Sequence, residues 1–271
     1  MKILAIDSAT SHQSVAILDG AAVLAHIHRD AEGSHAKFLV GSIDRALRTA
    51  DLTLRDLDGF AVSIGPGSFT GLRVGLATLL GFRTVLGKPV VAVPTLEAMA
   101  WNLRSIRGQV CPILKSRRNE VYWARYEWMP KLVLRRLVAE QVSSPDQVLA
   151  AIQDPVVVVG NGWEAYGAEM RKGMGSRSSL LTEAPPETMR PSAVSVGLAA
   201  RERFMRSEFV GIGAAPLYVQ RPEADIQYEQ NGGISAIERR KERAARRSRP
   251  KSADPVRNQA SAVRLNAKDR A

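Results

Sequence analysis

The chain has 271 residues, of which 45% are hydrophobic, so it is long enough for two modest domains with cores of their own. Its single cysteine, Cys111, excludes an internal disulfide and a thiolate-rich zinc site. The apolar run at the N-terminus is interrupted by Asp7 and is too short for a signal peptide or a membrane span, so we expect a soluble protein of the reducing cytoplasm.

The formal net charge of +11 is concentrated at the C-terminal end. Residues 234–271 hold 12 of the 38 Lys and Arg residues and 4 of the 27 Asp and Glu residues, which leaves a surplus of only 3 positive charges in the rest of the chain. This segment has too few large aliphatic residues to build a core, so we expect a disordered basic tail. A solubilising tail and an RNA-contacting arm explain the composition equally well.

Hydrophobic patterning predicts strands and helices that alternate along the first half of the chain. The expected strands cover residues 2–7, 14–19, 23–28, 60–64 and 90–93, and the expected helices cover residues 35–50, 70–86 and 96–103. The first three strands form a meander, and the two later strands are buried between helices. This half is expected to be an N-terminal lobe over residues 1–107.

The second half repeats this order. Strands are expected over residues 110–114, 120–127, 132–142 and 156–159, and helices over residues 145–152, from residue 163 onward, and over 191–206. Residues 175–190 are expected to be a connection. We therefore predict a second lobe over 108–233 that the helix 191–206 closes, in an α/β architecture with helices covering the sheets.

A glycine-rich loop joins the expected strand 60–64 to the following helix. Gly65, Gly67 and Gly71 permit backbone conformations that other residues avoid, and Ser68 or Thr70 can accept a hydrogen bond from the first N–H groups of the helix. Such a loop suits an anion or the close approach of a second protein. A tight turn without any ligand explains the same spacing.

Several ordered motifs resemble one bacterial family. ILAIDSAT, GPGSFTGLR followed by VGLAT, PTLEAMA and SRRNEVYWARYE are similar, in that order, to the TsaB (YeaZ) family, over about residues 1–225. The resemblance implies the two-lobed actin-like ATPase and sugar kinase superfold. It also implies a non-catalytic subunit in the synthesis of threonylcarbamoyladenosine in tRNA, which pairs with a catalytic TsaD-type subunit and with a TsaE-type ATPase, and which meets tRNA through that complex.

In this superfold, phosphate is held between two turns that each carry an aspartate. Asp7, with Ser8 and Thr10, fits the first turn, although a strand-end turn in which Asp7 accepts local N–H bonds explains the same residues. In the second turn, Lys115 stands where the family usually has its aspartate, and Asn119 where it has a glycine. A lysine cannot hold Mg²⁺, so we interpret these four residues, Asp7, Ser8, Thr10 and Lys115, as a vestigial phosphate loop.

No other catalytic centre is predicted. The chain has four histidines, and the pair His26 and His28 is expected on one face of a strand, which is more typical of sheet surface than of a metal site. Ser68 lacks an identifiable base. We therefore expect no metal, no required cofactor and at most weak nucleotide binding.

The glycine loop and its helix are then interpreted as a docking surface. Gly71 and Gly75 are four residues apart on one helix face, which Thr78 and Phe82 continue, and the resemblance implies that the first two helices of the domain pack against a partner. Leu72 is also an ordinary core candidate. The predicted interface residues are Ser68, Phe69, Thr70, Gly71, Leu72, Gly75, Thr78, Phe82, His35 and Leu39.

The favoured function is a scaffold and activator that forms a heterodimer, and a homodimer is left open. Two alternatives are an independent ATPase or small-molecule kinase of the same superfold, and a tRNA-binding module that uses the basic tail.

Overall fold

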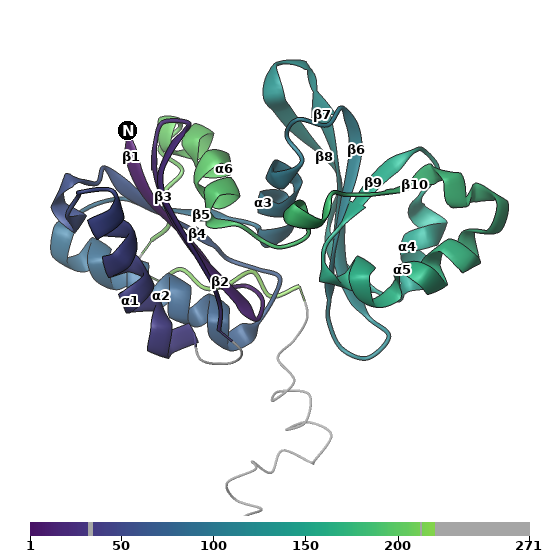
Figure 1. Cartoon of the computed structure of the whole chain (residues 1–271), viewed down its shortest axis with the longest axis horizontal. Coiled ribbons are helices and arrows are strands. Elements are labelled where there is room, and N and C mark those ends of the chain that lie inside the picture. Colours follow the sequence, from purple (N-terminus) through teal and green to yellow (C-terminus); the bar gives the residue numbers. More distant parts are fainter. Residues whose placement is uncertain (32–34, 212, 220–271) are drawn as a thin grey trace, which may run out of the picture. The chain divides into compact units, whose positions relative to one another are not determined.

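Two mixed sheets organise the computed structural model, which describes residues 1–31, 35–211 and 213–219 (Figure 1). Each of these sheets has five strands. The expected basic tail over residues 234–271 lies outside the described residues.

The first sheet has the strand order β3-β2-β1-β4-β5. Its strands are β1 (Lys2–Asp7), β2 (His12–Asp19), β3 (Ala22–Asp30), β4 (Gly59–Ser63) and β5 (Val90–Val93). The meander β1-β2-β3 is antiparallel, whereas β4 pairs parallel with both β1 and β5. Side chains alternate between the two faces of a strand, so both faces of this apolar sheet need a cover.

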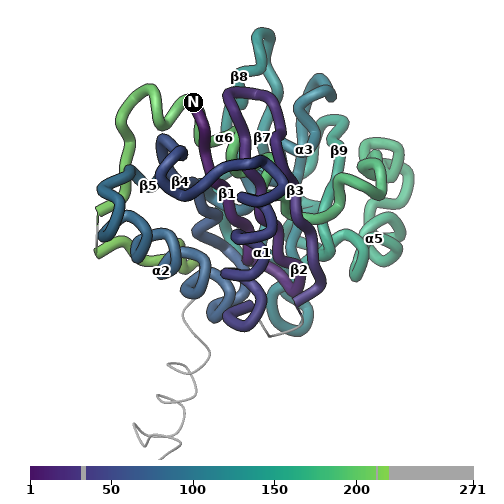
Figure 2. Tube along the Cα trace, turned by 60° about the vertical axis from the view of Figure 1, so that its left-hand side comes forward, coloured from purple at the N-terminus to yellow at the C-terminus, as the bar shows by residue number. Residues whose placement is uncertain are grey.

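Helices supply that cover. α1 (His35–Thr49) and α2 (Phe69–Leu86) pack on the face formed by Leu4 and Ile6 of β1, and α6 (Ala193–Met205) packs on the face formed by Ile3 and Ala5. Figure 2 shows α1 lying across the sheet with α2 beside it. The first core is therefore two apolar layers on opposite sides of one sheet.

The second sheet repeats the topology of the first with the order β10-β9-β6-β7-β8. Its strands are β6 (Gly108–Lys115), β7 (Val121–Met129), β8 (Val133–Ser143), β9 (Val156–Val159) and β10 (Leu181–Glu183). Here too the first three strands are antiparallel and the last two join in parallel. This common order and orientation confirms the predicted α/β fold with duplicated halves.

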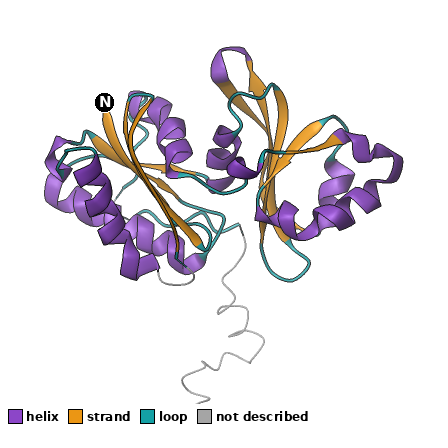
Figure 3. Cartoon of the chain, viewed as in Figure 1, coloured by secondary structure: helices purple, strands orange, loops and turns teal. Residues whose placement is uncertain are grey.

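The helices of the second sheet lie on both of its faces (Figure 3). They are α3 (Thr95–Asn102), α4 (Pro145–Ala151) and α5 (Asn161–Met174). Short 3₁₀ turns occur at Leu54–Asp56, Pro130–Leu132, Gly175–Leu180 and Pro186–Thr188.

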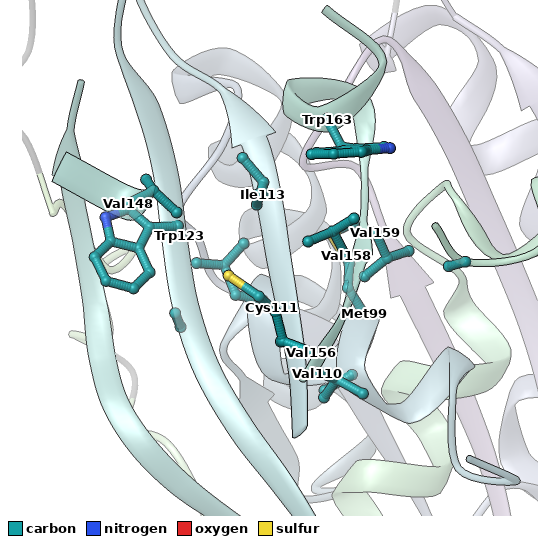
Figure 4. Packing of buried hydrophobic residues seen from close by; sticks show 14 of the residues in the cluster. Met99, Val110, Cys111, Ile113, Trp123, Val148, Val156, Val158, Val159 and Trp163 are labelled. Atoms are coloured by element: carbon teal, nitrogen blue, oxygen red, sulfur yellow. The ribbon is translucent and has the colours of Figure 1, made fainter. Parts of the chain in front are cut away.

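Cys111 lies inside the second core, beside Val158 and Ile113 (Figure 4). Burial raises the pKa of its thiol to about 12. A thiol in such a position remains protonated at neutral pH and acts as a small apolar side chain.

Two sequence-based expectations are wrong. The helix predicted over 191–206 does not close the C-terminal lobe, because α6 packs on β1, β2, β4 and β5 of the first sheet. Gly197 allows this contact, since a Cβ there would lie 2.4 Å from Leu18 Cδ1. The expected connection 175–190 also contains a strand, β10, which pairs with β9 although only its first residue is buried.

Candidate functional site

The glycine-rich loop folds onto the protein itself. Gly65 donates its N–H to Thr95 Oγ1 at 3.1 Å, and the Ser68 N–H donates to the carbonyl of Ala9 at 2.6 Å. Gly67 is required here, because a Cβ would lie 2.3 Å from the Ala9 oxygen. These N–H groups are used inside the fold, which favours the tight turn over an anion-binding loop.

Ser68, one of the two cap candidates in the sequence, directly precedes α2. Its hydroxyl oxygen accepts a hydrogen bond from the N–H of Gly71 at 3.2 Å. This is an N-cap, which satisfies one of the free donors of the first turn. The Ser68 hydroxyl therefore has a structural role at the start of α2.

The glycine face of α2 is buried, and its predicted exposure is wrong. A Cβ at Gly71 would lie 2.1 Å from the carbonyl oxygen of Ser8, and a Cβ at Gly75 would lie 2.5 Å from Ser8 Oγ. Ser8 also donates its hydroxyl to the carbonyl of Gly71 at 2.8 Å. The two glycines let α2 approach the turn after β1, so they serve an internal contact.

Three more predicted interface residues belong to the protein interior. His35, Leu39 and Leu72 are 4%, 1% and 1% exposed. The His35 ring lies against Gly71, so it fills the space between the starts of α1 and α2. Leu39 and Leu72 are core residues, and their contacts hold the two helices in place rather than meeting a partner.

The remaining predicted interface residues are more accessible. Phe69 and Thr70 are exposed, whereas Ser68, Thr78 and Phe82 are half-buried. Thr78 donates its hydroxyl to the carbonyl of Val74 within α2, and the Phe82 ring packs 5.9 Å from that of Phe60. Phe69 and Thr70 at the start of α2 are therefore the predicted residues best placed to meet another molecule.

The exposed side of α1 and α2 carries small and apolar residues that the sequence analysis missed. Val85 and Val40 are 83% and 62% exposed, and a Cβ at Gly81 or Gly41 would meet nothing within 4 Å. We call Val40, Gly41, Ala77, Gly81 and Val85 the outer α1–α2 face. Ala77, Gly81 and Val85 follow each other at four-residue spacing, and this spacing was the available signal.

α2 is predominantly apolar, and Arg73 and Arg83 are its charged residues. It is the one described helix whose length and composition would suffice to cross a membrane, yet it packs against the first sheet and has five buried residues among its 18. Apolar side chains on both sides of a helix exceed what one sheet face can cover. The outer α1–α2 face therefore has the character of a docking surface.

An aromatic cluster closes the N-terminal end of α2. The Arg73 guanidinium lies 3.8 Å from the centroid of the Phe69 ring, and its Nε donates to the Tyr218 hydroxyl at 2.9 Å. The segment around Tyr218 is fixed beside the glycine loop, since the Leu217 N–H donates to the Ile64 carbonyl at 2.7 Å. This cluster holds the exposed Phe69 ring in a defined position.

Asp7 lies at the end of β1 and is 1% exposed. Its Oδ1 accepts the Ala9 N–H at 3.1 Å, whereas Oδ2 and the Ser63 hydroxyl lack a hydrogen-bond partner of ordinary geometry among the described residues. Burial raises the pKa of Asp7 to about 6, against smaller lowering effects of Ser63 and Ala9. The local N–H bond is the one expected for a strand-end turn.

The other residues of the predicted phosphate loop are also placed by local bonds. Thr10 Oγ1 accepts the N–H of His12 at 3.3 Å, within the turn after β1. Lys115 ends β6 in the second sheet, where its side chain is exposed and its N–H donates to Asn161 Oδ1 at 2.8 Å. Asn119 adopts a left-handed conformation with φ of 59°, which asparagine tolerates better than most residues other than glycine.

Three histidines gather on one face of β2 and β3. The His28 ring centroid lies 5.7 Å from that of His12 and 6.3 Å from that of His26. Burial lowers the pKa of both His12 and His26, and Ser14 Oγ lies 2.9 Å from His26 Nε2. In the described part of the chain, no three His, Cys, Asp or Glu side chains converge as metal ligands.

Comparison with known proteins places most of this chain in a known group. The family model for TsaD, tRNA N6-adenosine threonylcarbamoyltransferase, matches residues 27–249. The tRNA threonylcarbamoyladenosine biosynthesis protein TsaB of Escherichia coli is 30% identical over 226 residues, which cover 81% of this chain and 95% of the relative. The protein of that name from Haemophilus influenzae is 33% identical over 195 residues, covering 68% of this chain and 82% of the relative. The structure of YeaZ from Pseudomonas aeruginosa is similar with a TM-score of 0.66 and 26% identity, and the match covers 80% of this chain and 99% of that one.

Proposed function

This chain belongs to the TsaD family and, within it, to the TsaB (YeaZ) group, and we propose that it takes part in the biosynthesis of threonylcarbamoyladenosine in tRNA as a non-catalytic subunit. In this proposal it forms a heterodimer with a TsaD-type catalytic subunit in the cytoplasm. A TsaE-type ATPase joins the pair, and tRNA is bound by the complex. The chain needs no cofactor of its own.

The observation that carries the proposal is the outer α1–α2 face. Gly41 and Gly81 leave the backbone of both helices uncovered, so a partner helix can approach closely there. The exposed valines Val40 and Val85 then provide the apolar area that the partner covers. On the opposite side, α1 and α2 are fixed to the sheet by core contacts, so this face is presented by a rigid support.

The two predicted phosphate turns support a non-catalytic role. Phosphoryl transfer depends on metal ions that neutralise developing charge on the phosphate oxygens. Asp7 is buried and bonded to its own turn, and Lys115 brings an ammonium group to the turn that usually carries the second carboxylate. This charge arrangement disfavours a Mg²⁺–triphosphate complex held by this chain alone.

The experiment is co-purification of the full chain with the TsaD-type subunit of the same cell, using a matched pair of leucine substitutions in α2. Gly81→Leu adds a side chain on the outer face, where a Cβ meets nothing within 4 Å. Gly75→Leu adds the same side chain on the inner face, where a Cβ would lie 2.5 Å from Ser8 Oγ. Thermal unfolding of each variant alone separates loss of docking from loss of fold.

We expect Gly81→Leu to abolish co-purification and to leave the isolated chain at least as stable, because leucine favours a helix over glycine by about 0.8 kcal/mol. Gly75→Leu should lower the stability of the isolated chain by about 1–3 kcal/mol or more through overpacking. A second pair is Val85→Asp on the outer face and Val133→Asp on exposed β8, and only the former should weaken docking. Undisturbed co-purification of both Gly81→Leu and Val85→Asp would refute the docking surface.

A further inference from the structure

A concave pocket of about 580 Å³ lies between the end of α3 and the connection from β7 to β8. Its volume falls in the range of roughly 300–1,000 Å³ that small-molecule sites occupy. The walls combine basic and apolar side chains. The residues that matter for the argument are Arg104, Arg107, Lys131, Ile106, Trp128 and Leu132. None of them belongs to the outer α1–α2 face or to the predicted phosphate turns.

The pocket is lined by three cations and by no carboxylate. Among the described residues, Arg104, Arg107 and Lys131 form no ion pair, and the one hydrogen bond of their side chains is from Arg104 Nη1 to the Trp101 carbonyl at 3.3 Å. On β8 of the same sheet, by contrast, the exposed Arg135 and Arg136 are paired with Glu127 and Glu140. Three unpaired cations around one hollow create a local excess of positive charge that an anion would neutralise.

The inner wall of the pocket is rigid and aromatic. Trp128 is 6% exposed, its Nε1 donates to the Ala100 carbonyl at 3.2 Å, and its ring lies edge-on to Trp101 with 5.1 Å between centroids. These contacts fix the indole before any ligand arrives. Because so little of the indole is exposed, the apolar wall that a ligand can touch is formed mainly by Ile106 and the exposed Leu132.

The outer rim of the pocket has an unusual backbone. Lys131 and Leu132 are consecutive residues with φ of 64° and 58°, a left-handed conformation that a leucine rarely adopts. Leu132 is moreover 54% exposed, so no burial of its side chain compensates for this conformation. Two consecutive left-handed residues are typical of a tight hairpin turn, and here they set the course of the β7–β8 connection along the rim of the pocket.

We propose that this pocket binds a small organic phosphate with a planar apolar body, of mononucleotide size. The phosphate is held by Arg104, Arg107 and Lys131, and the planar part lies against Ile106 and Leu132. Charge complementarity selects the anion, and the apolar wall distinguishes it from free phosphate. This binding involves no chemical step, and it is independent of the docking proposal.

The test is isothermal titration calorimetry of the full chain in EDTA with three probes: adenosine 5′-monophosphate, inorganic phosphate and adenosine. The substituted protein carries Arg107→Gln together with Lys131→Gln, both exposed positions that a glutamine replaces without burying a polar group. Arg55→Gln is the matched control, since Arg55 is exposed and lies in the turn before β4. Lys115→Gln reports on weak nucleotide binding at the other basic turn.

We expect saturable binding of the monophosphate at one site, weaker binding of inorganic phosphate and none of adenosine. The double substitution should raise the dissociation constant about tenfold or more, whereas Arg55→Gln and Lys115→Gln should leave it unchanged. The proposal is overturned if the monophosphate does not bind at millimolar concentration, if it binds no better than inorganic phosphate, or if the double substitution has no effect. Capture of an RNA oligonucleotide or an acidic peptide without binding of the monophosphate would also overturn it.

Discussion

Asp7→Asn should stabilise this protein at neutral pH. The folded pKa of about 6 lies above the value of 3.8 for an exposed aspartate, because burial disfavours the charged carboxylate. The folded state therefore binds this proton more tightly than the unfolded state. The stability that Asp7 contributes is fully present below the unfolded pKa and is lost as the pH rises through about 6.

The size of the effect follows from the pKa difference. A difference of about two pKa units means that the charged Asp7 carboxylate destabilises the folded protein by about 3 kcal/mol at pH 8. At pH 5 this destabilisation is about half as large. Asparagine is isosteric and uncharged, so it avoids this cost. Its Oδ1 can still accept the Ala9 N–H, and its amide can donate to the Ser63 hydroxyl, which has no partner of ordinary geometry in the described part of the chain.

Urea unfolding at pH 5 and pH 8, followed by circular dichroism, measures this gain. We expect Asp7→Asn to raise the free energy of unfolding at both values, and by more at pH 8. Asp56→Asn is the control of opposite sign, because hydrogen bonds from Thr53 lower the pKa of the exposed Asp56. If the gain in the free energy of unfolding is the same at both pH values, or if there is a loss at pH 8, then the buried carboxylate of Asp7 does not destabilise the folded protein as argued.

The same variant bears on the alternative function. An independent ATPase that used Asp7 for Mg²⁺ would lose its turnover in Asp7→Asn. The proposed subunit should instead show no turnover of ATP and Mg²⁺ comparable with that of ordinary kinases, with or without the substitution. Turnover at the kinase level that disappears in Asp7→Asn would therefore contradict the non-catalytic proposal.

Three further substitutions test contacts that hold the two cores. Gly197→Leu should lower the free energy of unfolding by about 2 kcal/mol or more, because a Cβ would already lie 2.4 Å from Leu18. An unchanged midpoint of urea unfolding would contradict this packing. Glu97→Gln removes the carboxylate that accepts from both terminal nitrogens of Arg203, at 2.7 and 2.8 Å. We expect thermal unfolding to show a loss of about 1–2 kcal/mol in stability, and no loss would mean that this ion pair contributes little. Ser144→Ala removes the N-cap of α4 and should cost about 1 kcal/mol, whereas Ser144→Asp should retain most of the stability.

Strongly patterned elements were predictable to the residue. The strands β5 (Val90–Val93) and β9 (Val156–Val159) are short valine-rich runs bounded by proline or glycine, and both are observed with the predicted bounds. β10 was missed because its three residues carry a single buried side chain and depend on pairing with β9. A hydrophobic pattern in the sequence reflects only which side chains are buried, so it gives little indication of a strand that is defined by its backbone pairing.

Tertiary placement was harder to predict than secondary structure. The helix α6 was predicted correctly, but the sheet it covers was not, because position along the chain does not determine which of two equally apolar sheets a helix meets. The docking residues of α2 were predicted on the wrong side of the helix for a related reason. α2 has Leu76 and Leu79 on one side and Val85 on the other, so its hydrophobic period identifies two apolar faces without indicating which one is buried.

The burial of the glycine face of α2 links the fold to the proposed function. Because Gly67 and Gly71 let α2 pack closely over Ala9 and Ser8, the turn after β1 is filled by the protein itself, and a phosphate would have to displace those contacts. The turn after β6 has the same place in the second sheet and likewise meets a helix, since the Lys115 N–H donates to Asn161 Oδ1 of α5 and a Cβ at Gly162 would lie 2.7 Å from Ile113 Cγ2, but the Lys115 side chain stays exposed. Both halves therefore seat a helix at the end of their first strand, and they differ in that the second turn also carries an exposed cation. A helix seated so firmly by its inner side can expose apolar residues on its outer side without loosening, which is the property that a docking subunit requires.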